Sequence, residues 1–136
     1  MNNSLNRVLV IDDDNAMTDL LRLSLETESF NVVISNSGQG GISAAQKSEP
    51  DVILLDMMMP DIDGWEICKS IREFSPVPII VLSALNTPGM VSRALDAGAD
   101  EFLVKPVPMG TLIAHLKRMT RRSRAEKNAT PGEHYR

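Results

Sequence analysis

The chain has 136 residues, 43% of them hydrophobic and 24% charged, which is typical of one globular domain and excludes the disordered and fibrous classes. The net charge of −4 is uneven, with −9 on residues 1–116 and +5 on residues 117–136, so the acidic body is unsuited to direct binding of nucleic acid. A single cysteine, no apolar run near the roughly 18 residues of a membrane span and no secretory leader pattern predict a soluble, cytoplasmic chain without membrane contact.

The apolar pattern alternates along the chain between short strand-like runs and helical spacing. In chain order it predicts a strand at 8–11, a helix at 15–28, a strand at 31–35, a helix at 38–47, a strand at 51–56, a helix at 63–73, a strand at 77–82, a helix at 88–97, a strand at 102–104 and a helix at 108–124. Strands that alternate with helices indicate βα units, a parallel sheet and right-handed crossovers.

Capping residues and apolar stripes support these boundaries. Asp14 is placed to cap the first helix at its N-terminus, and Gly98 is placed to end the fourth. Helical spacing assigns inward-facing stripes to the first, third, fourth and fifth helices. Their members are Met17, Leu20, Leu21 and Leu25; Ile67, Cys68 and Ile71; Val91, Ala94 and Leu95; and Met109, Leu112, Ile113 and Leu116.

The chain end differs from the body in composition. Residues 125–136 have no apolar period, so we expect a domain at 1–124 followed by a flexible tail or the start of a linker. The basic residues of the last helix fit a solvated helix terminus better than a nucleic-acid surface.

Polar residues follow four of the five predicted strands. The acidic run 12–14 follows the first strand, Asp56 ends the third, Ser83 follows the fourth and Lys105 follows the fifth. Because the carboxyl ends of parallel strands meet at one edge of a sheet, we expect these side chains to converge there. Taken singly, each fits an ordinary turn, cap or surface residue.

Together, these residue types indicate a particular chemistry. Carboxylates that lie close together repel one another unless a cation joins them, and hard oxygen ligands suit Mg²⁺ or Mn²⁺. A lysine and a hydroxyl facing such a cation form a pocket for a phosphoryl group. The set therefore favours phosphoryl transfer to or from a carboxylate.

Four segments resemble the receiver domain of two-component response regulators, in order and with the spacing of that family. They are VLVIDDD at 8–14, LLDMMMPDIDG at 54–64, VLSA at 81–84 and GADEFLVKP at 98–106. The resemblance extends over about residues 6–122. It implies a flavodoxin-like, doubly wound (βα)5 fold with a five-stranded parallel sheet in the order 2-1-3-4-5.

The resemblance also implies a role for each matching residue. Asp56 would accept the phosphoryl group from a phosphohistidine, and Lys105 and Ser83 would bind phosphoryl oxygens. Asp12, Asp13, Asp56 and the backbone carbonyl of Met58 would bind Mg²⁺ or Mn²⁺. The Lys105–Pro106 peptide bond is expected to be cis.

Other positions are implied to control the switch and its lifetime. Ser83 would move toward the phosphoryl group, and Phe102, where the family more often has Tyr, would turn into the vacated space; the alternative is that Phe102 is a core aromatic in both states. The apolar side chains of Met58 and Leu85 would slow hydrolysis by excluding water, although both also fit ordinary loop positions.

The resulting prediction is a signalling switch, not an enzyme: its only chemistry is self-catalysed phosphoryl acceptance and slow autodephosphorylation. The donor would be a sensor histidine kinase or a phosphotransfer protein. The face formed by helix 88–97, strand 102–104 and helix 108–124 would serve partners or a homodimer, and the domain could regulate a DNA-binding output domain. Aspartyl phosphatases and flavodoxin-like cofactor binders fit the motifs less well. The alternative is a phosphorylation-independent interaction module.

Overall fold

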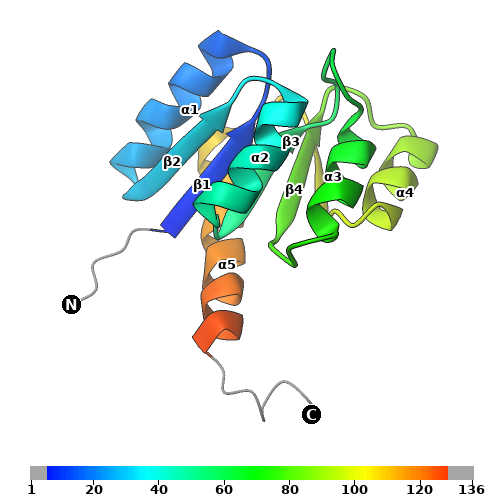
Figure 1. Ribbon diagram of the computed structural model, residues 1–136. Helices are drawn as coiled ribbons and strands as arrows, with labels where there is room; N and C mark the ends of the chain where they lie inside the picture. The colour runs from blue at the N-terminus through cyan, green and yellow to red at the C-terminus, as the bar shows by residue number, and fades with distance from the viewer. Residues whose placement is uncertain (1–5, 129–136) are drawn as a thin grey trace.

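The computed structural model describes residues 6–128, in which five strands and five helices alternate (Figure 1). All strand pairs are parallel, and the sheet order is β2-β1-β3-β4-β5, as the resemblance implies. The elements are β1 (Asn6–Ile11), α1 (Asn15–Thr27), β2 (Phe30–Ser35), α2 (Gly38–Ser48), β3 (Val52–Asp56), α3 (Gly64–Arg72), β4 (Ile79–Ser83), α4 (Pro88–Asp96), β5 (Glu101–Val104) and α5 (Met109–Asn128).

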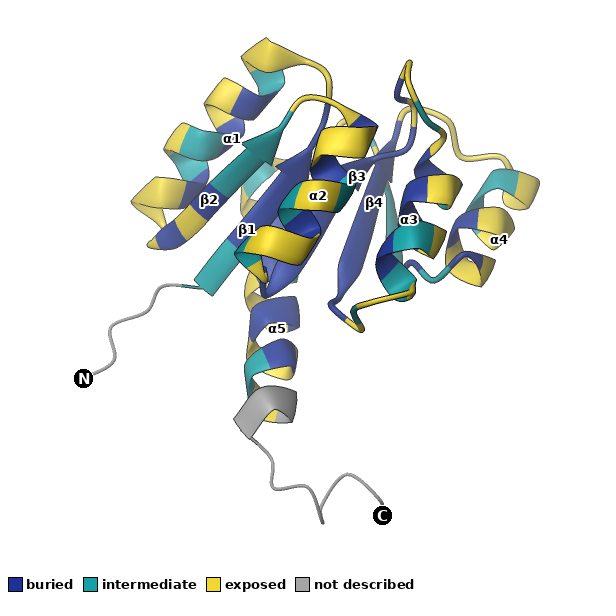
Figure 2. Ribbon diagram, viewed as in Figure 1, coloured by how far each residue is buried: buried dark blue, intermediate teal, exposed yellow. Residues whose placement is uncertain are grey.

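Alternate residues of the central strands point to opposite faces of the sheet, and each face has its own core. Leu9, Ile11 and Ile53 pack with the buried residues of α2, α3 and α4. Val8, Val10 and Leu54 pack with those of α1 and α5. Figure 2 shows β1, β3 and β4 as buried, with helices that are buried only on their inner sides. Burial on both faces explains why the strands β1, β3 and β4 are continuous apolar runs.

Two leucines expected on the inner stripes are exposed. On α1 the buried residues are Thr18, Leu21 and Leu25, whereas Leu20 is 51% exposed. On α4 only Ala94 is buried, and Leu95 is 45% exposed. Both leucines follow or precede a buried residue by one position, which places them about 100° around the helix and off the inward stripe. The stripes are therefore narrower than predicted.

The helix ends largely follow the predicted capping. The Asp14 carboxylate accepts from the backbone N–H of Met17. Gly98 has φ +116° and follows α4, where the Ala99 N–H donates to the Ala94 carbonyl, a Schellman-type ending. Helix α5 continues through Asn128, four residues beyond its expected end, because strong helix formers follow Arg124. Of the tail expected at 125–136, residues 129–136 lie outside the described residues.

In Figure 1 the strands all run toward the same edge of the sheet, which we call the carboxyl edge (residues 12–14, 56–63, 83–87 and 105–108). Helix α5 extends past the other edge, the amino edge, which contains the connections before β3 and β4 (residues 49–51 and 73–78). No helix of the described residues is long and apolar enough to cross a membrane.

Candidate functional site

Three charged side chains from three strands meet at the carboxyl edge. The Lys105 Nζ atom lies 3.6 Å from Asp12 Oδ2 and 3.6 Å from Asp56 Oδ2. Asp12 and Asp56 are only 3% and 8% exposed, so these charges lie in a partly desolvated setting. At 3.6 Å the contacts are ion pairs without close hydrogen bonds. The lysine is therefore centred between the two carboxylates.

Asp13 completes an acidic cluster. Asp12, Asp13 and Asp56 each contribute a carboxylate oxygen, and these oxygens lie within 4.8 Å of one another. Burial and the neighbouring Asp56 and Asp13 carboxylates raise the pKa of Asp12, whereas the Asp14 N–H and Lys105 act to lower it. The Asp14 N–H donates to Asp12 Oδ1 at 2.9 Å. One lysine does not offset three carboxylates, so the cluster carries excess negative charge.

The donor set fits a hard divalent cation. All three groups are carboxylates, and Asp13 is exposed to solvent, which leaves room for the water ligands that Mg²⁺ retains. No histidine or thiolate is among the clustered groups of the described residues, so the set favours Mg²⁺ or Mn²⁺ over softer metals. Asp12, Asp13 and Asp56 are the residues that would hold the ion.

The loop after Asp56 is tight and divides the methionine run. The Met58 N–H donates to Asp56 Oδ1 at 3.1 Å, and the Gly64 N–H donates to the Met57 carbonyl at 3.2 Å. A Cβ at Gly64 would lie 2.8 Å from the Met57 Cα, so the loop closes only with glycine there. Met57 and Met59 are buried in the core, whereas Met58 is 52% exposed beside the acidic cluster.

Ser83 occupies the end of β4, and its hydroxyl contacts the β4–α4 loop and α4. Leu82 is paired in register with Asp56, so Ser83 lies one residue beyond it at the edge. The Ser83 hydroxyl accepts from the Leu85 N–H at 3.1 Å and lies 3.9 Å from the Met90 sulfur on α4. Among the described residues, no hydrogen bond joins Ser83 to Asp56 or Lys105. Ser83 therefore links the β4–α4 loop to α4 in this structure.

The remaining predicted positions surround this edge. Phe102 is half-buried against the core beneath α3 and α4, Leu85 is 47% exposed, and Ala84 is exposed beside it. The Lys105–Pro106 bond is cis, as expected. The direction of the Met58 carbonyl and the two positions of Phe102 remain predictions.

Cys68 lies within the core and away from this edge. It is fully buried on α3, and desolvation raises the pKa of its thiol to about 11. A thiol that is neutral and inaccessible at neutral pH is inert.

Sequence reasoning missed two residues that hold this edge together. The Asn36 side chain donates to the Asp12 carbonyl at 2.8 Å. The Asp61 carboxylate accepts from the Gly38 N–H at 3.0 Å and from the Gln39 N–H at 3.2 Å, and these hydrogen bonds lower the pKa of Asp61. Asn36 follows β2 at the carboxyl edge, so the rule that flagged the other strand ends could have found it.

The face of α4, β5 and α5 holds charged residues that pair within the chain. Asp100 accepts from Arg72 at 2.9 Å and from Arg122 at 3.1 Å. Glu101 pairs with Arg118 and, at 2.9 Å, with His115. His115 is half-buried in this cluster.

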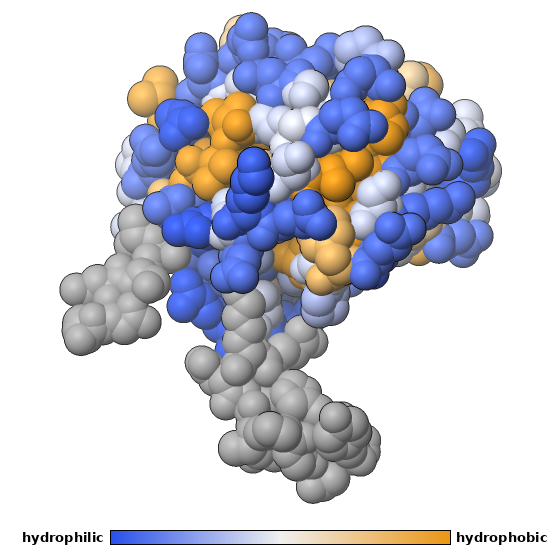
Figure 3. All heavy atoms as spheres, viewed as in Figure 1, coloured by the Kyte–Doolittle hydropathy of each residue, from blue (hydrophilic) through white to orange (hydrophobic). Residues whose placement is uncertain are grey.

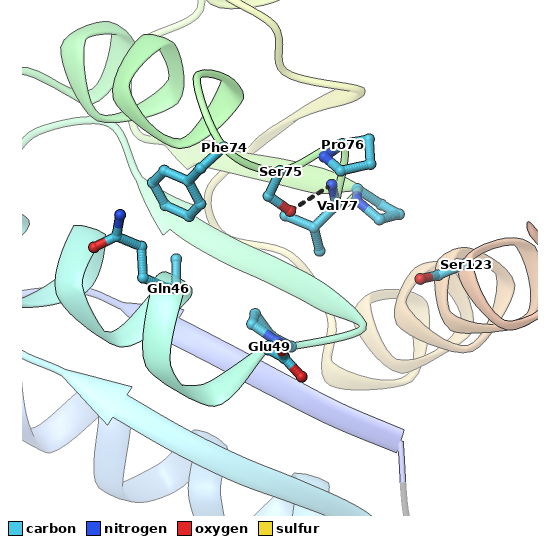
Figure 4. A pocket seen from close by; sticks show the side chains of 10 residues that line it. Gln46, Glu49, Phe74, Ser75, Pro76, Val77 and Ser123 are labelled. Atoms are coloured by element: carbon cyan, nitrogen blue, oxygen red, sulfur yellow. Dashed lines mark hydrogen bonds between the residues drawn. The ribbon is translucent and has the colours of Figure 1, made fainter. Parts of the chain in front are cut away.

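A cavity of about 640 Å³ lies at the amino edge, remote from the acidic cluster. Figure 4 shows Phe74 and Val77 facing Gln46 and Glu49, with Ser123 of α5 at one side. Figure 3 shows apolar side chains gathered between α2 and α3. Of the described residues that line this cavity, only Glu49 is charged, so they do not form a set of converging charges like that at the carboxyl edge.

Comparison with known families and proteins agrees with this geometry. A family model described as "Response regulator receiver domain" matches residues 8–117. The chain is 40% identical over 119 residues to the transcriptional regulatory protein AfsQ1 of Streptomyces coelicolor, covering 88% of this chain and 53% of the relative. It is 36% identical over 124 residues to the response regulator MprA of Mycobacterium avium, covering 90% and 54%. The chain thus spans about half the length of these curated relatives.

Solved structures give the same result. A CheY-like receiver domain protein from Methanospirillum hungatei matches with a TM-score of 0.85 and 27% identity, covering 90% of this chain and 99% of the other. The BeF3-activated N-terminal receiver domain of RstA from Klebsiella pneumoniae matches with a TM-score of 0.81 and 28% identity, covering 85% and 99%.

Proposed function

Because this chain belongs to the response regulator receiver domain family, we propose that it is a phosphorylation-controlled switch in which Asp56 accepts a phosphoryl group. The donor would be a histidine kinase or a phosphotransfer protein of a two-component system. The observation that carries this proposal is the position of Lys105, at 3.6 Å from both Asp12 and Asp56 within an acidic cluster. That arrangement provides a nucleophile, a counter-charge and a cation site at one point.

The transfer step uses groups that are present at the carboxyl edge. An Asp56 oxygen attacks the phosphorus of a phosphohistidine, the P–O bond forms, the P–N bond breaks, and the imidazole leaves with the electron pair and takes a proton from solvent. Lys105 offsets the charge on one phosphoryl oxygen as the group arrives. The Met58 N–H, 3.1 Å from Asp56 Oδ1, orients the carboxylate so that its other oxygen can attack. The chemistry ends at this acceptance and at slow autodephosphorylation, so no separate enzymatic substrate is proposed.

A divalent cation has a defined place in this scheme. Asp12, Asp13 and Asp56, together with the Met58 carbonyl, would hold Mg²⁺ or Mn²⁺. When bound, the ion supplies positive charge that lets an anionic phosphoryl group approach three carboxylates. The pKa of Asp12, raised by burial and by the neighbouring carboxylates of Asp56 and Asp13, is consistent with this role.

The contacts of Ser83 supply a route from the site to α4. The phosphoryl group adds acceptor oxygens and negative charge at Asp56, which would draw the Ser83 hydroxyl away from Leu85 and Met90. Because the hydroxyl now contacts both, its movement would release the β4–α4 loop and the start of α4. Phe102 would fill the space vacated near β5. The face of α4, β5 and α5 would then present a different surface to partners.

The lifetime of the phosphoryl group would depend on Met58 and Leu85. Both side chains are apolar and about half exposed at the carboxyl edge, where they would exclude the attacking water. The Met58→Asn/Leu85→Glu double variant should dephosphorylate faster than the parent, as measured by the decay of phosphoprotein after the donor is removed. An unchanged decay rate would show that these are ordinary loop residues.

The switch would act on an output domain or on a second copy of the chain in the cytoplasm, without contacting a membrane or binding nucleic acid itself. The matched region covers only about half of the length of these relatives, which supports an output domain, for instance one that binds DNA. Leu95 and Val104 are exposed on the α4–β5–α5 face, which supports a homodimer there. Such a dimer would exchange the pairs of Asp100 and Glu101 within the chain for pairs between chains.

The intact mass of the protein tests the proposal. After incubation with acetyl phosphate and Mg²⁺, the parent should gain one phosphoryl group, and Asp56→Asn should gain none. Chelation of Mg²⁺ should abolish the gain. If the parent gains no mass, the function moves to the alternative, a phosphorylation-independent interaction module.

A further inference from the structure

The turn at 36–39, which comprises the two residues after β2 and the first two residues of α2, contains no predicted site residue. It nevertheless bonds to the loop at 12–14 and to the loop that follows Asp56. Figure 1 shows β2 and α2, which this turn joins. On one side, the Asn36 amide donates to the Asp12 carbonyl at 2.8 Å, and also lies 3.3 Å from the buried Thr18 hydroxyl. The Asp12 N–H donates to the Ser35 carbonyl at 3.1 Å. The peptide that joins Asp12 to Asp13 is therefore held from the end of β2.

On the other side, the turn holds the loop that follows Asp56. Asp61 accepts from the Gly38 N–H with both oxygens at 3.0 Å and from the Gln39 N–H at 3.2 Å. These N–H groups belong to the first turn of α2, where a carboxylate satisfies donors that lack intrahelical partners. A Cβ at Gly38 would overlap the Ile62 side chain, so the close approach of loop and helix requires glycine at position 38.

These two contacts oppose a force that acts within the site. Three carboxylates with oxygens within 4.8 Å of one another repel, and this repulsion tends to separate the loop at 12–14 from Asp56 and the loop that follows it. The turn at 36–39 is bonded to both loops, so it resists that separation. A cation then meets ligands that are already close together, which lowers the cost of ordering them on binding.

We propose that Asn36 and Asp61 are positioning residues, which hold the two acid-bearing loops together through the turn at 36–39 and so raise the affinity of the cluster for a divalent cation. This inference rests on the proposed function only in the role given to the bound cation, since the affinity itself can be measured without phosphorylation. Groups that orient metal ligands without touching the metal typically change metal affinity by about 10- to 100-fold. Because Asn36 and Asp61 act on the backbone or several residues away from a ligand, we expect the lower end of that range.

The experiment measures binding of Mn²⁺ alone, from the loss of the free-ion EPR signal during titration. Asn36→Ala removes the donor to Asp12, and Asp61→Asn removes the charge and one acceptor while keeping the side-chain size. Asn31→Ala is a matched control on β2, since the exposed Asn31 side chain has no hydrogen-bond partner among the described residues. Asp63→Asn removes the same charge from the same loop, and Asp63 makes no side-chain cap bond.

We expect Asn36→Ala and Asp61→Asn each to weaken Mn²⁺ binding about tenfold, with Asn31→Ala and Asp63→Asn close to the parent. Asn36→Gln keeps an amide donor and should recover part of the Mn²⁺ affinity. If Asn36→Ala acted only by lowering stability, restoring the amide donor would not restore the affinity. Thermal melts establish that each variant is folded, and the conservative Asp61→Asn keeps the test valid if Asn36→Ala does not fold. Equal affinities in all folded variants would overturn the proposal, as would equal losses in Asp61→Asn and Asp63→Asn.

The same preparations separate this inference from the proposed function. Intact mass after acetyl phosphate and Mg²⁺ is recorded for the parent alongside the Mn²⁺ titration. A parent that binds Mn²⁺ but gains no phosphoryl group contradicts the proposed function and leaves the comparison of affinities intact. A parent that is phosphorylated, with variants that bind Mn²⁺ like the parent, contradicts only the positioning role.

Discussion

The two edges of the sheet differ in how they treat charge. At the carboxyl edge, Asp12 and Asp56 are buried with a third carboxylate nearby and share one lysine. At the amino edge, Asp51 is equally buried, but it accepts from the Arg7 N–H at 2.7 Å and pairs with Arg124 at 3.4 Å. Buried charge is compensated at one edge and left in excess at the other.

Under the proposed function, this difference distinguishes the edge that reacts from the edge that stabilises the fold. The amino edge has a cavity of about 640 Å³, and a search for cavities alone would select it. Its buried acid contributes to the fold by fastening α5 to β1 and β3. The carboxyl edge places three carboxylates beside one lysine, an arrangement expected if it binds a cation and a phosphoryl group as proposed.

The largest expected effect is the loss of the single counter-charge at the carboxyl edge. Lys105→Ala should slow phosphoryl acceptance from acetyl phosphate by about 10²- to 10³-fold, the usual result of removing one preorganised charge or donor from a reacting group. Lys69→Ala, on the exposed side of α3, is the control and should react like the parent. Similar rates of phosphoryl acceptance in Lys105→Ala and Lys69→Ala would contradict a special role for the charges of the carboxyl edge.

Removing the buried acid of the amino edge should affect stability without affecting the reaction. Asp51→Ala leaves the Arg7 N–H without its acceptor and removes the pair with Arg124, and should lower the free energy of unfolding by about 1–3 kcal/mol. Urea denaturation measures the loss. Phosphorylation of the folded variant should proceed at the parent rate, and a large change in that rate would assign chemistry to the amino edge.

Neutralising Asp12, a buried acid of the carboxyl edge, should raise the stability of the metal-free protein, whereas removing Asp51 should lower it. The pKa of Asp12 is raised by folding, so its stabilising contribution is full below the unfolded pKa and is lost as pH rises through the folded pKa. In chelator at pH 7, Asp12→Asn should therefore melt above the parent, with the difference shrinking as pH falls toward about 4. A variant that melts below the parent at pH 7 would show that Asp12 is compensated after all.

The smallest effect is expected at the cavity of the amino edge. Phe74 is 38% exposed, so Phe74→Ala removes only part of a buried ring and should cost about 1 kcal/mol of stability. Phosphorylation should be unchanged. Slower phosphorylation in Phe74→Ala would indicate that the cavity contributes to the reaction.

The sequence predicted the fold because its strands are buried on both faces. Continuous apolar runs such as 52–55 are unambiguous once helical segments separate them, and parallel strands place their carboxyl ends together. The buried faces of the helices were harder to predict. Leu20 and Leu95 are apolar and each lies one position from a buried residue, Leu21 or Ala94, and only packing against the sheet decides which of the two neighbours is buried. Helix α5 also continues to Asn128, beyond the end expected near Arg124, because residues after Arg124 have high helix propensity.

The charged residues of the site were predictable, whereas its supports were not, apart from the position of Asn36 after a strand. Asp12, Asp56 and Lys105 follow strands and carry chemistry, so strand ends and residue types sufficed to bring them together. Asn36 and Asp61 act by hydrogen bonds to backbone groups, and such contacts depend on loop shape, which apolar periodicity does not encode. The direction of the Ser83 hydroxyl toward Met90 likewise needed coordinates.

The most direct test of the difference between the edges is amide NMR of the parent and Asp56→Asn, before and after addition of BeF₃⁻ with Mg²⁺. In the parent, we expect the largest shifts in the residues that follow β1, β3, β4 and β5, extending into α4, with residues around Phe74 and Val77 nearly unmoved; Asp56→Asn should not respond. Shifts centred on the amino edge, or the same response in Asp56→Asn, would contradict the assignment of phosphoryl chemistry to Asp56 at the carboxyl edge.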